Sequence, residues 1–180
     1  MSFLGFNAPV NVRVDNLIGT ITWLNPTNTF SSDDNKATSV LTVLDPISNY
    51  LICDNFRFSL PIWATIKGVE FSLEKSSTVG SAVSDHRIRL TKNGVIGSTD
   101  KSVGGNWSTS DSVQSYGGAS DLWGEILTPG DVMASGFGIA IAATTSLAAT
   151  AQIDQVLAKI YYDFPFVPKN VFGSNIIIKL

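Results

Sequence analysis

Few side chains in this 180-residue sequence could take part in catalysis or bind a metal. It contains one histidine, His86, and one cysteine, Cys53, so a His-dependent triad would rest on His86 alone and an intrachain disulfide is impossible. Asp85 precedes His86, but adjacent residues of a strand point to opposite faces, so we expect a partly buried structural histidine rather than an acid–base pair. Cys53 lies in an apolar run, which favours a small buried side chain over a nucleophile.

Acidic side chains offer two further candidates. The Asp-Asp-Asn run at 33–35 places three oxygen ligands in one turn, which would suit Ca²⁺, but its spacing differs from that of an EF-hand loop and these residues are ordinary turn formers. A glycosidase would need a facing pair of carboxylates, which the glutamates Glu70, Glu74 and Glu125 could supply. Because Glu70 falls on the outward face of its expected strand, we do not expect such a pair. With so few candidate residues, we expect no enzyme activity, no cofactor and no metal.

Three aromatic residues, Trp107, Tyr116 and Trp123, lie among loops rich in glycine and serine. Aromatic faces beside polar side chains can hold a sugar ring, and Asn106 and Asp121 are close in sequence. The same rings can instead pack beneath the loops, because Trp and Tyr bury a large area and need only one hydrogen bond. We expect the buried arrangement and keep a glycan-binding surface of these three residues as the alternative.

The composition describes a folded chain with little charge. Hydrophobic residues make up 44% and charged residues 15%, which excludes disorder over the whole length. The net charge of -3 provides no basic footprint for nucleic acid or for an anionic membrane. No apolar run approaches the ~20 residues that cross a bilayer, and the first residues lack the pattern of a signal peptide. We therefore expect neither nucleic acid nor a membrane as a partner.

Short alternating runs separated by turns predict the elements that position these residues. Phe56, Phe58 and Leu60 share one face of a run that ends at Pro61. In the next run, Val69, Phe71 and Leu73 share one face. In the run 83–90, His86, Ile88 and Leu90 share one face, and the opposite face carries Asp85, Arg87 and Arg89. That run ends at a hairpin signal, Asn93-Gly94. Further strands are expected at 20–24, 37–44, 50–53 and 136–143, which together indicate an antiparallel β-sandwich or barrel.

Two segments also show helical signals. Thr128 is a good N-cap for a short turn that begins with Pro129. The apolar residues of the run 153–161 fit the spacing of a helix, whereas its end, Ile160-Tyr161-Tyr162, favours a strand. Periodicity alone leaves this second segment open.

The two ends of the chain differ from its middle. Residues 1–16 and 164–180 combine proline with apolar side chains and little charge, which suits neither a helix nor a solvated tail. They can be extended arms that pair with a neighbouring subunit, or they can cover their own sandwich. We expect arms, with these partner-binding residues: Phe3, Leu4, Phe6, Val10, Phe166, Val167, Phe172, Ile176, Ile177 and Ile178.

The order and spacing of several short motifs carry a resemblance that covers about residues 20–163. These motifs include Trp23-Leu24-Asn25-Pro26, Phe56-Arg57-Phe58-Ser59-Leu60-Pro61, Lys92-Asn93-Gly94, Tyr116-Gly117-Gly118, Asp121-Leu122-Trp123-Gly124, Leu127-Thr128-Pro129 and Tyr161-Tyr162. In this order the chain resembles a family of β-sandwich modules found in structural proteins of tailed bacteriophages and prophages. The resemblance implies an all-β, antiparallel β-sandwich of jelly-roll type at residues 17–163, with the segment 154–162 as its last core strand, and a virion role without enzymatic activity.

A single module with two apolar arms suits one virion role in particular. Arms that reach neighbouring subunits add buried area and fasten a shell against internal pressure. We therefore expect a capsid decoration (cement) protein whose partners are the major capsid protein and further copies of itself, as a homo-oligomer such as a trimer. The alternative is a carbohydrate-binding adhesin module of a tail fibre or spike, with Trp107, Tyr116 and Trp123 as its stacking surface.

Overall fold

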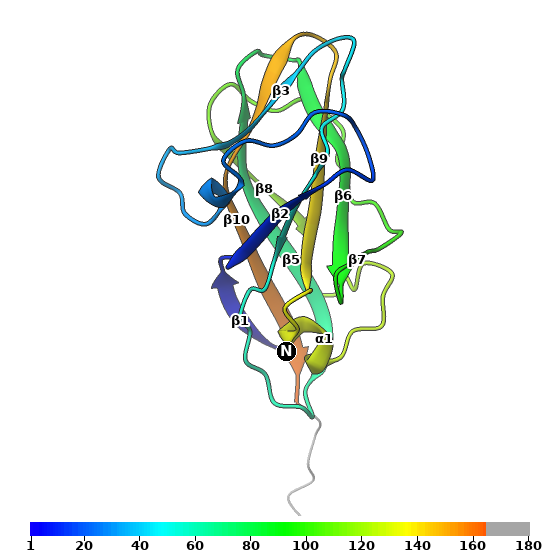
Figure 1. The fold of residues 1–180 in the computed structure, drawn as a ribbon. Coiled ribbons are helices and arrows are strands. Elements are labelled where there is room, and N and C mark those ends of the chain that lie inside the picture. Colours follow the sequence, from blue (N-terminus) through cyan, green and yellow to red (C-terminus); the bar gives the residue numbers. More distant parts are fainter. Residues whose placement is uncertain (165–180) are drawn as a thin grey trace, which may run out of the picture.

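Two antiparallel sheets pack face to face in the computed structural model, which describes residues 1–164 (Figure 1). One sheet, sheet A, has the order β1-β10-β5-β8, with β3 also paired to β10; the other, sheet B, has the order β2-β4-β9-β6-β7. The strands of sheet A are β1 (Ser2–Asn7), β3 (Ala37–Leu41), β5 (Thr65–Ser77), β8 (Ser112–Gly117) and β10 (Ala149–Asp163). Those of sheet B are β2 (Asn11–Asp15), β4 (Tyr50–Asp54), β6 (Val83–Lys92), β7 (Val95–Ile96) and β9 (Gly138–Thr145). The predicted all-β antiparallel sandwich is confirmed.

Two short helices connect these strands. A 3-10 turn, η1 (Pro26–Thr29), precedes β3, and the helix α1 (Pro129–Met133) precedes β9. Thr128 caps α1 as predicted, because its hydroxyl accepts the backbone N–H of Asp131 while the Asp131 carboxylate accepts the N–H of Thr128.

The run 153–161, which the sequence leaves open between helix and strand, belongs to the 15-residue strand β10. Ile153 pairs with Lys75 and Gln155 with Glu74, so Asp154 is an extra residue, a β-bulge. Because of the bulge, the next apolar residue that faces inward after Ile153 is Val156, three positions later. A spacing of three residues between inward apolar side chains is what a helix would also produce, which explains the ambiguity of the sequence.

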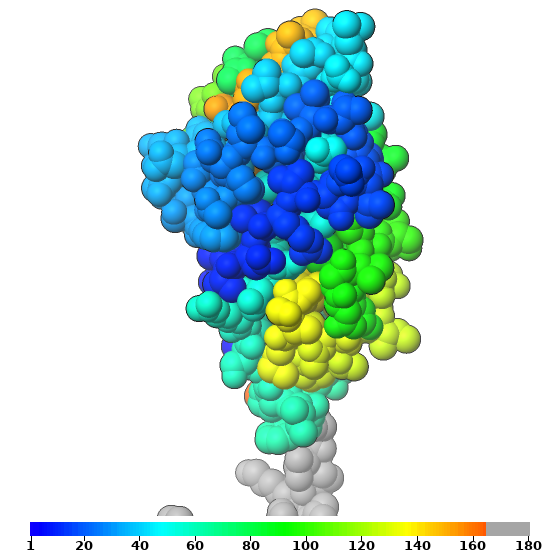
Figure 2. Space-filling model, in the orientation of Figure 1, coloured from blue at the N-terminus to red at the C-terminus, as the bar shows by residue number. Residues whose placement is uncertain are grey.

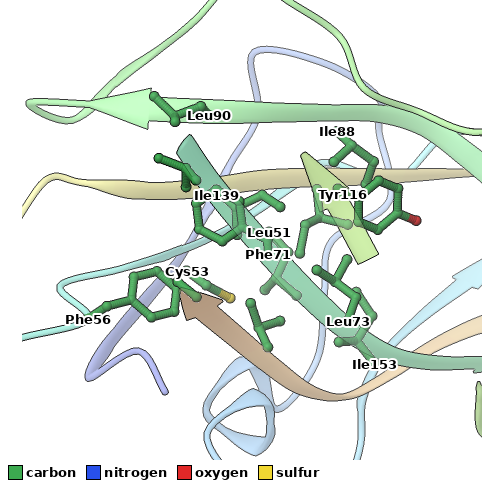
Figure 3. Packing of buried hydrophobic residues seen from close by; sticks show 14 of the residues in the cluster. Leu51, Cys53, Phe56, Phe71, Leu73, Ile88, Leu90, Tyr116, Ile139 and Ile153 are labelled. Atoms are coloured by element: carbon green, nitrogen blue, oxygen red, sulfur yellow. The ribbon is translucent and has the colours of Figure 1, made fainter. Parts of the chain in front are cut away.

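The core lies between the two sheets, where apolar side chains from β4, β5, β6, β9 and β10 meet (Figure 3). The Phe71 ring contacts Trp123 and Phe56, with ring centroids 5.4 Å and 5.8 Å apart. Cys53 is part of this core, and burial raises the pKa of its thiol to about 12. The thiol is therefore protonated and unreactive near neutral pH, in agreement with the prediction of a buried structural cysteine.

Residues 1–16, which the sequence predicts to be an arm, instead form strands of both sheets. β1 pairs with β10, with Phe3 opposite Tyr161, and β2 pairs with β4, with Val12 opposite Cys53. Leu4 and Val12 pack against the core, which ties the segment to its own chain. The expected boundary at residue 17 is therefore wrong. Of the expected C-terminal arm, only Phe164 is described; Phe166, Val167, Phe172, Ile176, Ile177 and Ile178 lie outside the described residues.

Candidate functional site

The three aromatic residues of the alternative glycan-binding surface are buried, so this assignment is wrong. Trp107 is 4% exposed, Tyr116 2% and Trp123 1%. The indole of Trp123 donates to the carbonyl of Val69 at 3.0 Å and packs on Phe71, which leaves no ring face for a sugar. The expectation that these rings pack beneath their loops is correct, and two of them also join a buried polar group.

That group, the polar cluster, consists of Lys75 on β5, Asp85 on β6, Trp107 and Tyr116 on β8. The Asp85 carboxylate accepts from Lys75 Nζ at 2.6 Å, from Trp107 Nε1 at 2.8 Å and from the Tyr116 hydroxyl at 2.8 Å. The backbone N–H of Val103 donates to it as well, at 3.1 Å. Lys75 also contacts the Tyr116 hydroxyl and lies 4.8 Å from the centre of the Trp107 ring. Since β5 and β6 belong to different sheets, the cluster joins the two layers.

Asp85 faces inward because β6 contains a bulge. Asp85 pairs with Ala143 and Arg87 with Ala142, so His86 is the extra residue. The bulge shifts the alternation by one position, which places Asp85 on the same side as Ile88 instead of with Arg87. The sequence prediction that Asp85 points outward is therefore wrong, and His86, which it places inward, is half-buried at the bulge.

The environment of the polar cluster favours a structural role. Burial lowers the pKa of Lys75, and the Asp85 carboxylate beside it opposes this shift. Burial also raises the pKa of Tyr116, and the negative charge of Asp85 raises it further, so the phenol stays neutral and donates. Four donors occupy the two oxygens of Asp85. The carboxylate is therefore fully engaged as a hydrogen-bond acceptor.

The turn at 33–35, weighed as a Ca²⁺ site, is held by a buried carboxylate on β10. Asp154 accepts the backbone N–H of Asp33 at 3.5 Å and that of Asp34 at 3.2 Å. Asp33 itself accepts from the N–H of Asn35, an interaction that lowers the pKa of Asp33. Within residues 1–164, no three His, Cys, Asp or Glu side chains gather in a way that would hold a metal ion.

The chain begins and β10 finishes at the same end of the sandwich (Figure 1), and several exposed apolar residues belong to the segments that meet there. Ser2 pairs with Tyr162 and Thr65 with Asp163, so the starts of β1 and β5 lie on either side of the end of β10. Phe3 is 60% exposed and Trp63 63%. We call this surface the apolar end; its exposed residues are Met1, Phe3, Phe6, Ile62, Trp63 and Phe164.

Lys159 restrains the two rings that β1 contributes to the apolar end, together with the neighbouring ring of Tyr161. The ammonium of Lys159 lies 4.5 Å from the centre of the Phe3 ring, 5.3 Å from that of Phe6 and 4.8 Å from that of Tyr161. The Tyr161 hydroxyl donates to Glu70 at 2.6 Å. Rings restrained in this way lose little further freedom when a partner covers them, which favours binding.

The structure divides the predicted partner residues of the first segment into two pairs. Phe3 and Phe6 are exposed, whereas Leu4 and Val10 are half-buried against the sandwich. Sequence analysis misses Ile62 and Trp63, although Pro61 just before them marks the end of the alternating run that begins at Phe56. Their proximity to Phe3 follows only from strand pairing.

Comparisons with known proteins add little. No known family model matches the chain, and no curated protein does so either. Among solved structures it is similar to the N-terminal cellulose-binding domain of β-1,4-glucanase C from Cellulomonas fimi, with 8% identity, 76% of this chain and 88% of that chain covered, and a TM-score of 0.35. At that level of likeness, shared function does not follow. Within the described part, no helix is long and apolar enough to span a membrane.

The first prediction concerns the polar cluster. Replacing Asp85 with Ala leaves the Lys75 ammonium buried without its carboxylate, so we expect the free energy of unfolding to fall by about 3–5 kcal/mol. Urea unfolding followed by tryptophan fluorescence measures this change. The matched control is Asp111→Ala, which breaks the more exposed pair with Lys36 and should cost about 0–1 kcal/mol. Equal effects of the two substitutions would contradict a special role for the cluster.

A second prediction concerns His86. Burial lowers the pKa of His86 below 6.5, and the charge of Arg87 lowers it further. The unfolded chain then binds more protons in the window between the folded and unfolded pKa values, so stability present above this window is lost as the pH falls through it. We expect the free energy of unfolding to decrease between about pH 7 and pH 5, the range in which histidine titrates. His86→Gln should remove this dependence, and an NMR titration that gives a pKa above 6.5 would contradict it.

Proposed function

We propose that this chain is a non-enzymatic structural protein of a tailed-bacteriophage virion, a capsid decoration protein that binds the outer shell through its apolar end. Its partners are the major capsid protein and neighbouring copies of itself. The proposal builds on the order of sequence motifs that resembles the phage sandwich family and on the antiparallel sandwich itself. The observation that carries it is the group of exposed apolar side chains at one end of the molecule.

The apolar end has the features expected of a binding surface. Large exposed apolar groups that lie together on a soluble domain commonly mark an interaction site. Aromatic residues are favoured at such sites, and Phe3, Phe6 and Trp63 come from two segments that are far apart in sequence. Polar residues at its border, such as Asp163, which pairs with the amino group of Met1 at 3.1 Å, resemble the polar rim of an interface.

The proposal also assigns a contact to the apolar C-terminal sequence. The last core strand, β10, ends at Asp163, beside the apolar end, and the apolar sequence 165–180 follows directly. In this proposal both contact the shell or an adjacent copy, so that each subunit is fastened at two places. Two linked contacts bind more strongly than either alone because the second is made at a high effective concentration.

A third prediction tests the apolar end. The double variant Phe3→Ser/Trp63→Ser removes two exposed rings without touching the core, and each ring would contribute about 1.5–3 kcal/mol when buried by a partner. We expect binding to purified shells to weaken at least tenfold per ring, as measured by co-sedimentation. Val113→Ser, at an exposed valine on β8, is the control and should bind as the wild type does. Unchanged binding by the double variant would overturn the assignment of this surface. Separately, cryo-electron microscopy of the virion that locates the chain on the tail would overturn the capsid role.

A fourth prediction concerns residues 165–180. Deleting them leaves every residue of the two sheets and of the described core in place, so we expect thermal unfolding to change little. Shell binding should weaken, because one of the two contacts is lost. Circular dichroism and co-sedimentation measure the two effects. Wild-type shell binding by the shortened chain would show that the segment takes no part in attachment.

A further inference from the structure

The outer face of sheet B carries a hollow that the proposed function does not use. Ala140 and Ala142 on β9, between β4 and β6, are small and fully buried, and Ile18 and Ile96 pack against the cluster that they form with Tyr50 and Ile52. Figure 2 shows this side of the molecule, with the dark blue segment 11–20 beside the green strands β6 and β7. The hollow has a volume of about 330 Å³, and its lining residues are Leu17, Ile18, Tyr50, Arg87, Arg89 and Ile96.

Three arginines point to this face of sheet B, and they differ in their partners. Arg13 forms an ion pair with Asp54 and lies near the carbonyl of Gly94. Arg87 lies 3.4 Å from Asp100 and donates to the backbone carbonyl of His86. The side chain of Arg89 forms neither a hydrogen bond nor an ion pair with any residue in 1–164, and its Nε is buried. Arg89 lines the hollow, so its guanidinium is a cation there that residues 1–164 leave without an ion-pair partner.

A second unused polar group faces the same hollow. Tyr50 is 5% exposed, and its hydroxyl has no hydrogen-bond partner among the described residues. Burial raises the pKa of Tyr50, with smaller contributions from nearby charges, so the phenol remains a neutral donor. Leu17, Ile18 and Ile96 supply apolar walls. Mostly apolar walls with a few convergent polar groups are the usual composition of a small-molecule site.

We propose that this hollow binds a compact monocarboxylate. The planar guanidinium of Arg89 can donate two parallel hydrogen bonds to a carboxylate, and the Tyr50 hydroxyl can donate a third. Arg87 is already paired with Asp100, whereas Arg89 has no ion-pair partner among residues 1–164, so a ligand with one negative charge would supply one. The apolar walls then contact the carbon skeleton. The volume is at the lower end of the roughly 300–1,000 Å³ typical of ligand sites, which suits a ligand of about one sugar ring.

Two classes of ligand could present such a carboxylate, an acidic sugar and an aliphatic acid, and they differ in the carbon skeleton that carries it. Butyrate and glucuronate are suitable probes, and butyramide and glucose are their neutral counterparts. The full-length chain is titrated with each, and the side-chain Nε–H signal of Arg89 is followed by NMR. We expect saturable shifts with the two acids and none with the neutral compounds. Tighter binding of glucuronate would identify the acidic sugar, and tighter binding of butyrate the aliphatic acid.

Variants connect the signal to the hollow. Arg89→Gln should weaken binding of the better acid by about tenfold or more, because a hydrogen bond to a charged group contributes about 1.5–3 kcal/mol. Tyr50→Phe keeps the ring in place and should weaken binding severalfold. Arg57→Gln, at an exposed arginine elsewhere, is the control and should have no effect.

Three results would overturn the proposal: no saturable response to either acid, equal responses to the acids and their neutral counterparts, or wild-type affinity in Arg89→Gln. Tighter binding of inorganic phosphate than of either acid would also overturn it, because the site would then prefer a different anion. None of these outcomes depends on the apolar end, so the capsid proposal and this one can fail separately.

Discussion

The buried carboxylate of Asp85 connects the two layers of this sandwich. Apolar packing between sheets is not directional, whereas the Lys75 ammonium, the Trp107 indole and the Tyr116 hydroxyl each reach Asp85 in one arrangement only. A buried ion pair contributes little net free energy, because desolvation of both charges offsets their attraction. Its effect is to make other registers of β5 against β6 expensive, since they would leave a buried charge unpaired. The hydrogen bond from Val103 extends the same constraint to the loop after β7.

Two bulges that sequence periodicity does not reveal each involve a buried aspartate. His86 is the extra residue next to Asp85, and Asp154 is itself the extra residue in β10. A bulge changes inward positions to outward ones, so a strict period of two assigns the wrong face to every residue on one side of it. The runs without a bulge, such as the one with Val69, Phe71 and Leu73, are predicted correctly. The all-β class, the Thr128 cap and the buried Cys53 also follow from local chemistry alone.

Alternation of apolar and polar residues also identifies buried side chains in segments that form no strand. Phe56, Phe58 and Leu60 are buried as their spacing predicts, but the backbone between them has positive φ at Arg57 and joins no strand of either sheet. The expected strand at 20–24 contains only isolated bridges, at Ile21 and Leu24. Side-chain pattern therefore indicates which residues face the core, whereas strand pairing depends on neighbours that are distant in sequence.

The candidate surfaces were partly predictable for the same reason. The sequence identifies Phe3 and Phe6 as residues that need a partner, but it places them on an arm, because proline and low charge do not distinguish a free segment from an edge strand. β1 is the edge of sheet A, and there one row of its side chains remains exposed beside Lys159 and Tyr161. Pairing of β1 with β10 of the same chain fixes the positions of those rings. A partner would therefore meet a preformed surface rather than a segment that must become ordered on contact.

The two surfaces lie on different sheets, which determines how they can be used together. Phe3 and Phe6 belong to the edge strand of sheet A, whereas the hollow beside Arg89 opens on the outer face of sheet B. A partner that covers the rings of β1 contacts sheet A, and the core between the sheets separates it from Arg89. A molecule attached through its apolar end would therefore keep the hollow of sheet B open to a small ligand. Attachment and ligand binding would then be independent unless a second copy packs against sheet B.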